Sequence, residues 1–165
     1  MSRTARKKHR PASREVLLAR LGAVHVGMAP RLDAGQIRDL ELAHYEQGPD
    51  AIARGDATAA TLWSWAGGCL TWSRVAQEMR RGEREMQSLL DVVGDVIQRF
   101  MAGGKIGFSG AQYQAAKAGT EVMGELAKIV PRLTAIAAAE WSDALIGRIE
   151  RGTAAWPEGV DHGAP

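Results

Sequence analysis

A chain of 165 residues is long enough for one domain with a real core, in which about 70% of the unfolded surface can be buried. Six of its 21 Lys and Arg residues precede the first acid, Glu15, and the rest of the chain holds fifteen cations against 19 acids. The body is therefore mildly acidic, which argues against a uniformly basic nucleic-acid-binding surface. The single cysteine, Cys69, excludes an intrachain disulfide and a zinc finger and fits a reducing, cytoplasmic setting.

Residues 1–14 form a basic segment that we expect to be disordered in isolation, because it contains Pro11 and no apolar periodicity. Its six cations are candidate contacts for DNA or RNA phosphate: Arg3, Arg6, Lys7, Lys8, Arg10 and Arg14. If all of them bind duplex DNA, the logarithm of the affinity should fall with the logarithm of salt concentration with a slope of about −5. No aromatic residue lies among the charges, so base stacking is not expected. A solubilising leader without a specific partner is the alternative.

Residues 15–28 contain an apolar run that weakly favours a helix. Arg20 and His25 interrupt the run and no convincing cleavage site follows, so a signal peptide is not expected. No stretch approaches the roughly 20 uncharged apolar residues that span a bilayer, and we expect a soluble protein without membrane contact.

Two helices are predicted next, separated by a short segment. Asp33 is a plausible N-cap for a helix over residues 33–47 that packs across the bundle, and residues 50–55 should add a single turn. Asp56 or Thr58 can cap the following helix.

The helix over residues 58–81 has one apolar seam with spacings of three and four residues. The seam consists of Leu62, Trp65, Cys69, Trp72, Ala76 and Met79. Gly67 and Gly68 lie in the middle of this helix. Such a pair either kinks a helix or lets a neighbouring backbone come close.

The clearest amphipathic helix begins after Gly82. Its apolar positions are Met86, Leu89, Leu90, Val93, Ile97, Phe100 and Met101. Residues 103–110 are glycine-rich but lack the spacing of a phosphate-binding loop and follow a helix, so they are interpreted as a turn. Ser109 and Gln112 then form a capping-box pair that opens another helix.

That helix has a seam of mostly small residues, which allows a partner helix to pack tightly. The seam consists of Tyr113, Ala116, Thr120, Met123, Ala127 and Val130, and Pro131 ends the helix. A last helix is expected over residues 134–151, with Ile136, Ala137, Trp141, Ala144, Leu145 and Ile149 directed inward. The predicted fold is all-α: an antiparallel bundle of about five helices over residues 15–152, with a flexible end over residues 153–165.

No reactive group is assembled by the sequence, so neither an enzyme nor a cofactor is expected. Glu41 and His44 form one Glu-x-x-His pair on a helix face, but a metal site in a helical bundle needs a second pair, and a partly buried His44 is the favoured interpretation. Cys69, on an apolar seam, is expected to be a buried small hydrophobe. No arrangement typical of a hydrolase is present, and no catalytic or metal-binding residue is predicted.

Trp63 points away from the seam that holds Trp65 and Trp72. A tryptophan there either enters a second core layer or anchors a protein partner. Burial is the favoured alternative, and exposure of Trp63 would indicate a protein interface. Arg80, Arg81 and Arg84 form a small basic cluster that could extend a phosphate track.

Two short motifs, Lys7-Lys8-His9-Arg10-Pro11 and Gly107-Phe108-Ser109, give the chain a resemblance to small helical proteins carried by bacterial phages and plasmids, a group without an established activity. The resemblance implies a mobile element in a bacterial cytoplasm. The leading hypothesis is a non-enzymatic helical protein whose basic tail contacts nucleic-acid phosphate while the bundle mediates association, for example as a homodimer. The alternative is a module that inhibits or redirects a host protein, with the tail incidental.

Overall fold

The computed structural model describes residues 31–45 and 48–157, which fold into six α-helices with no strand beyond one isolated bridge between Arg31 and Pro131. The helices are α2 (Ala34–Tyr45), α3 (Pro49–Arg54), α4 (Ala59–Met79), α5 (Glu83–Met101), α6 (Gly110–Ile129) and α7 (Arg132–Glu150). The predicted all-α class is confirmed, and α3 is a short helix where a single turn was expected. The predictions for residues 1–14 and 15–28 lie outside the described residues.

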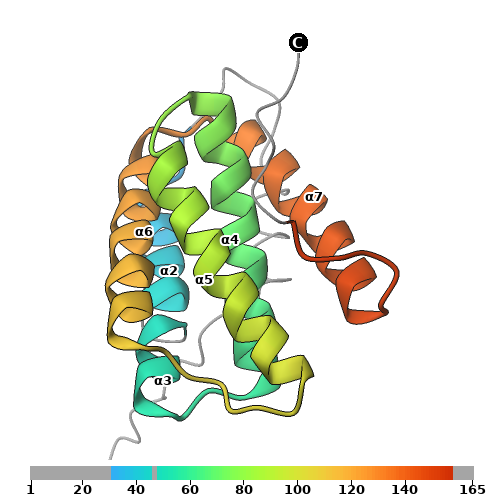
Figure 1. Ribbon diagram of the computed structural model, residues 1–165. Coiled ribbons are helices and arrows are strands. Elements are labelled where there is room, and N and C mark those ends of the chain that lie inside the picture. Colours follow the sequence, from blue (N-terminus) through green and yellow to red (C-terminus); the bar gives the residue numbers. More distant parts are fainter. Residues whose placement is uncertain (1–30, 46–47, 158–165) are drawn as a thin grey trace, which may run out of the picture.

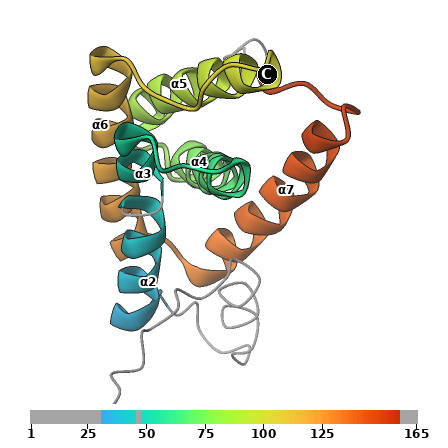
Figure 2. The ribbon, with the colours of Figure 1, turned by 90° about the horizontal axis from the view of Figure 1, so that it is seen from below.

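Helix α4 occupies the centre of the bundle, as the view in Figure 2 shows. It packs most extensively against α7 and α5, while α5 packs against α6, and α2 and α3 lie on α6. Short connections make α4, α5, α6 and α7 alternate in direction in Figure 1, which is the expected antiparallel arrangement. Helix α2 lies beside α6 in both views.

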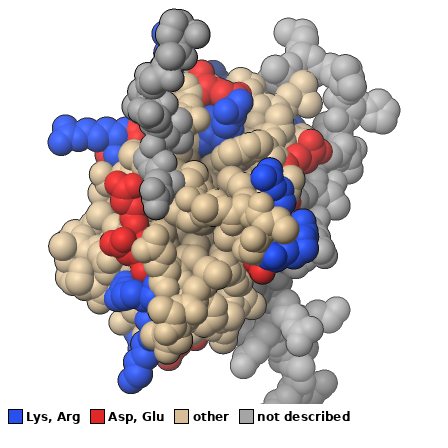
Figure 3. Space-filling model, turned by 45° about the vertical axis from the view of Figure 1, so that its right-hand side comes forward, with Lys and Arg blue, Asp and Glu red and all other residues tan. Residues whose placement is uncertain are grey.

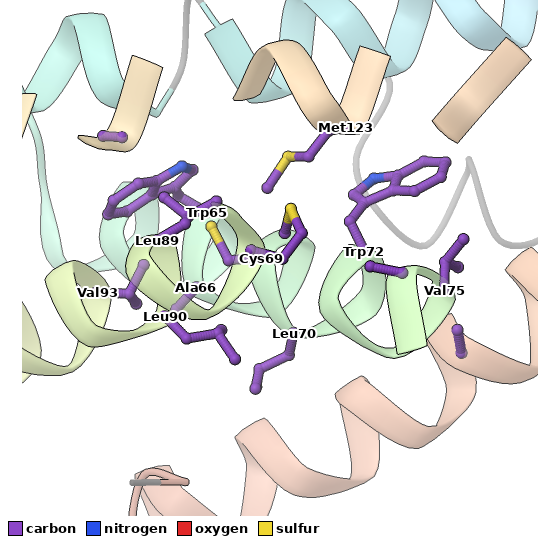
Figure 4. Close-up of a cluster of buried hydrophobic side chains, with 14 of the residues drawn as sticks. Trp65, Ala66, Cys69, Leu70, Trp72, Val75, Leu89, Leu90, Val93 and Met123 are labelled. Atoms are coloured by element: carbon purple, nitrogen blue, oxygen red, sulfur yellow. The ribbon is translucent and has the colours of Figure 1, made fainter. Parts of the chain in front are cut away.

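The central position of α4 explains its composition. Every residue from Trp65 to Ser73 is buried, and a helix that is apolar all round belongs in a core. The predicted seam is buried as expected, except that Met79 is half-buried, but the buried surface extends well beyond one seam. The helix runs through Gly67 and Gly68 without a break, and both residues are buried. In Figure 4 side chains of α5 and Met123 of α6 gather around α4.

Three helices begin at the side-chain caps that the sequence predicts. Asp33 Oδ1 accepts a hydrogen bond from the backbone N–H of Gln36 at 2.8 Å, and Ser109 Oγ accepts one from the N–H of Gln112 at 3.2 Å. Each glutamine side chain in turn accepts a bond from the backbone N–H of its cap residue, which completes a reciprocal capping box. Of the two alternatives for α4, Thr58 makes the capping bond, at 3.2 Å.

Close contact between α5 and α6 depends on Gly119. A Cβ atom at this position would lie 2.7 Å from Leu89 Cβ, closer than packed carbon atoms approach. The predicted seam of α6 is buried around it, with Tyr113 half-buried in the first turn of the helix. The expectation of a tightly packing, small-residue seam is therefore confirmed.

The predicted inward face of α7 is wrong for three of its six residues. Ala137, Trp141 and Ala144 are exposed, whereas Ile149 is buried as expected and the other two residues are half-buried. The buried residues are Arg132, Ala135, Ala138, Ala139, Ser142, Ile146 and Ile149. This face consists mostly of small side chains because α7 packs closely on α4, where Thr71 Oγ1 and Ser142 Oγ lie 2.6 Å apart.

Two further positions differ from the expected pattern. Met101, counted among the apolar positions of α5, is the last residue of that helix and 63% exposed. Conversely, Trp156 is not part of a loose end: its Nε1–H donates to the carbonyl of Leu90 at 3.1 Å, and its ring lies against Gly94. The expected flexible end is therefore wrong for Trp156, and residues 158–165 lie outside the described part.

Candidate nucleic-acid and protein interfaces

The chain enters the described structure beside the turn between α6 and α7. The backbone of Arg31 pairs with that of Pro131 there, and this turn lies at the same end of the bundle as the turn between α4 and α5 in Figure 1. The six predicted phosphate-binding residues lie outside the described residues. Arg31 is the first described residue that follows them in the chain.

The predicted cluster of Arg80, Arg81 and Arg84 lies at this same end, and all three residues are exposed. Arg80 adopts a left-handed conformation, with φ of 50°, and its N–H caps the end of α4. Neither Arg80 nor Arg84 forms an ion pair with another described residue. Their charges are thus available to an anionic ligand at the end where the chain enters.

Acidic residues surround the third arginine. A hollow of about 430 Å³ between the start of α5 and α6 is lined by Arg81 together with Glu85, Glu121 and Glu125. The hydrogen bond from Lys128, 2.7 Å from Glu125, together with the charges of Lys128 and Arg81, lowers the pKa of Glu125. Three carboxylates repel phosphate, so this hollow does not favour the predicted extension of a phosphate track to Arg81.

The described residues form neither a metal-binding cluster nor a reactive thiol site. Among residues 31–45 and 48–157, no three His, Cys, Asp or Glu side chains come together as a metal-binding group. The side chains of Glu41 and His44, on α2, lie outside the described part. Cys69 is fully buried, and burial raises the pKa of its thiol well above the usual range. The expectation of a buried small hydrophobe at Cys69 is confirmed.

The exposed tryptophan is Trp141, whereas the sequence made Trp63 the candidate anchor for a protein partner. Trp63 is half-buried and packs against the core, in agreement with the favoured alternative. Trp141 is 43% exposed, with the guanidinium of Arg74 lying 5.9 Å from its ring centroid. The missed signal was a second spacing of four, four and three residues in α7: Leu133, Ala137, Trp141 and Ala144.

Comparison with known proteins finds no matching family model, no matching curated protein and no matching solved structure. The resemblance to phage and plasmid proteins therefore stays a prediction. Within the described ranges, no helix combines the length and the apolar character that crossing a membrane requires.

Proposed function

We propose that this protein binds nucleic-acid phosphate without base recognition, through the basic segment of residues 1–14. The observation that carries the proposal is the segregation of charge. Six cations and no acid precede Glu15, whereas the remainder of the chain has more acids than cations. A cation cluster of this kind releases condensed counterions when it binds the nucleic-acid backbone, and that release drives sequence-independent affinity.

The exposed cations of Arg80 and Arg84 support the proposal by their position. Both lie at the end of the bundle where Arg31 enters the helices. Neither residue lines the acidic hollow beside Arg81. We therefore expect them to add to the affinity as secondary contacts.

The salt dependence of binding to a random-sequence duplex tests the proposal. We expect the full chain to bind with a log–log slope of about −5 from residues 1–14, to which Arg80 and Arg84 add up to about −2. Deleting residues 2–14 should abolish most of this slope. The double variant R80Q/R84Q should reduce the magnitude of the slope by about 2 at most.

A matched control is K105Q/K117Q, which removes the same charge from exposed positions away from that end. The control should leave the slope unchanged. Absence of affinity in the intact chain at low salt, or affinity that survives the deletion, would overturn the proposal.

A further inference from the structure

The outer face of α7 carries an exposed apolar stripe. Leu133 is 64% exposed and Trp141 is 43% exposed, and they are two of the three large hydrophobic side chains that are exposed among the described residues. Ala137 and Ala144 continue the stripe. Among the described helices α7 packs extensively on α4 alone, so within residues 31–45 and 48–157 it is an edge helix whose opposite face is uncovered.

The stripe is arranged symmetrically about its largest member. Trp141 is the middle residue of α7, which spans Arg132–Glu150, and the small residues Ala137 and Ala144 lie about one turn to either side. The Arg74 guanidinium lies over the indole ring and restricts its position. A large, positioned side chain between two small ones is self-complementary in an antiparallel pair centred on it, because the two indoles meet at the centre and each alanine lies opposite an alanine of the other helix.

We propose that α7 forms an isologous interface with α7 of a second copy of this chain, antiparallel and centred on Trp141. With a rise of about 1.5 Å per residue, this register places Ala137 of one copy within about 1.5 Å, along the axis, of Ala144 of the other. The same register separates the two copies of Ala137 by about 12 Å along the axis.

The charges of this face favour a second copy over a highly charged partner. Glu140 and Arg148, one charge of each sign, border the stripe, and Arg74, whose guanidinium lies over Trp141, pairs with Glu78 at 3.2 Å. Figure 3 likewise shows groups of both signs on this side of the molecule. Such a face offers no charge complement to nucleic acid or to a strongly basic or acidic protein. One helix face supplies less than the roughly 800 Å² per partner of a standard interface, so the dimer is weak and concentration-dependent.

Sedimentation equilibrium of the full chain over a range of concentrations tests the association. We expect the weight-average mass to rise from 17.7 kDa toward twice that value as concentration increases. The variant L133E/W141E should remain at the monomer mass. The control M101E, which places one glutamate at the remaining exposed large apolar position, on α5, should associate like the wild type. Circular dichroism checks that each variant is folded.

Cysteine cross-linking tests the register and retains Trp141. The double variant A137C/A144C should form interchain disulfides on mild oxidation, whereas A137C and A144C alone should not, since a disulfide requires Cα atoms about 4.4–6.8 Å apart. The native Cys69 is buried and should form no interchain disulfide in any variant, so it serves as the internal control. A wild-type chain that stays monomeric, a dimer that survives L133E/W141E, or cross-linking of A137C alone would each overturn the proposal.

Discussion

Replacing Gly119 with alanine should destabilise the bundle, although alanine is the better helix former. In a helix interior the replacement gains about 1 kcal/mol. At this position, however, the new Cβ atom would lie 2.7 Å from both Leu89 Cβ and Leu89 Cδ2. Overpacking of this kind costs about 1–3 kcal/mol, so the sum is a net loss of about 1 kcal/mol in the free energy of unfolding.

Gly124 provides the matched control, because it lies in the same helix and a Cβ atom there would meet nothing within 4 Å. G124A should therefore keep the whole gain of about 1 kcal/mol. Urea unfolding followed by circular dichroism measures both variants, and the difference between them isolates the contact with Leu89. In thermal melts we expect Tm shifts of opposite sign, about 2–4 °C per kcal/mol. Equal stabilisation by G119A and G124A would refute the close packing of α5 on α6.

Three further outcomes follow from local contacts. S109A removes one side of the capping box with Gln112 and should lower the free energy of unfolding by about 1 kcal/mol, measured by urea titration. Cys69 should react with a thiol reagent only as fast as the chain opens, because its side chain is fully buried and burial also raises the pKa of the thiol; rapid labelling of the native protein would contradict this. Lys128 lowers the pKa of Glu125, so K128Q should raise it in an NMR titration. This interaction favours the folded state above the unfolded-state pKa of Glu125 and is lost as pH falls through the lowered folded-state pKa.

Local features of the fold could be predicted because short-range physics decides them. Asp33, Thr58 and Ser109 cap their helices through bonds to backbone N–H groups three residues ahead, and Pro131 lacks the N–H that α6 would need to continue. The inward face of α5 was also predictable up to its last turn, because its apolar residues occupy one side of the helix.

The candidate interfaces likewise combine features that the sequence shows with features that only the structure shows. The cations of residues 1–14 and the Arg80 cluster can be identified from composition alone. The position of Arg31 beside Pro131, at the end of the bundle that carries the Arg80 cluster, depends on a pairing between residues 100 positions apart. The exposure of Trp141 could also be predicted only with knowledge of which helix α7 packs against.

The sequence alone determined the helical class, most helix boundaries and the separation of a basic segment from a mildly acidic body, because caps, periodicity and charge act over a few residues. Only the tertiary structure decided that residues 65–73 of α4 are buried all round, that α7 turns Ala135, Ala138 and Ala139 inward and Trp141 outward, and that Trp156 packs on α5. In α7 alanine occurs on both faces, so periodicity carries little information about direction. There the choice of buried face follows from how closely the helix can approach its neighbour.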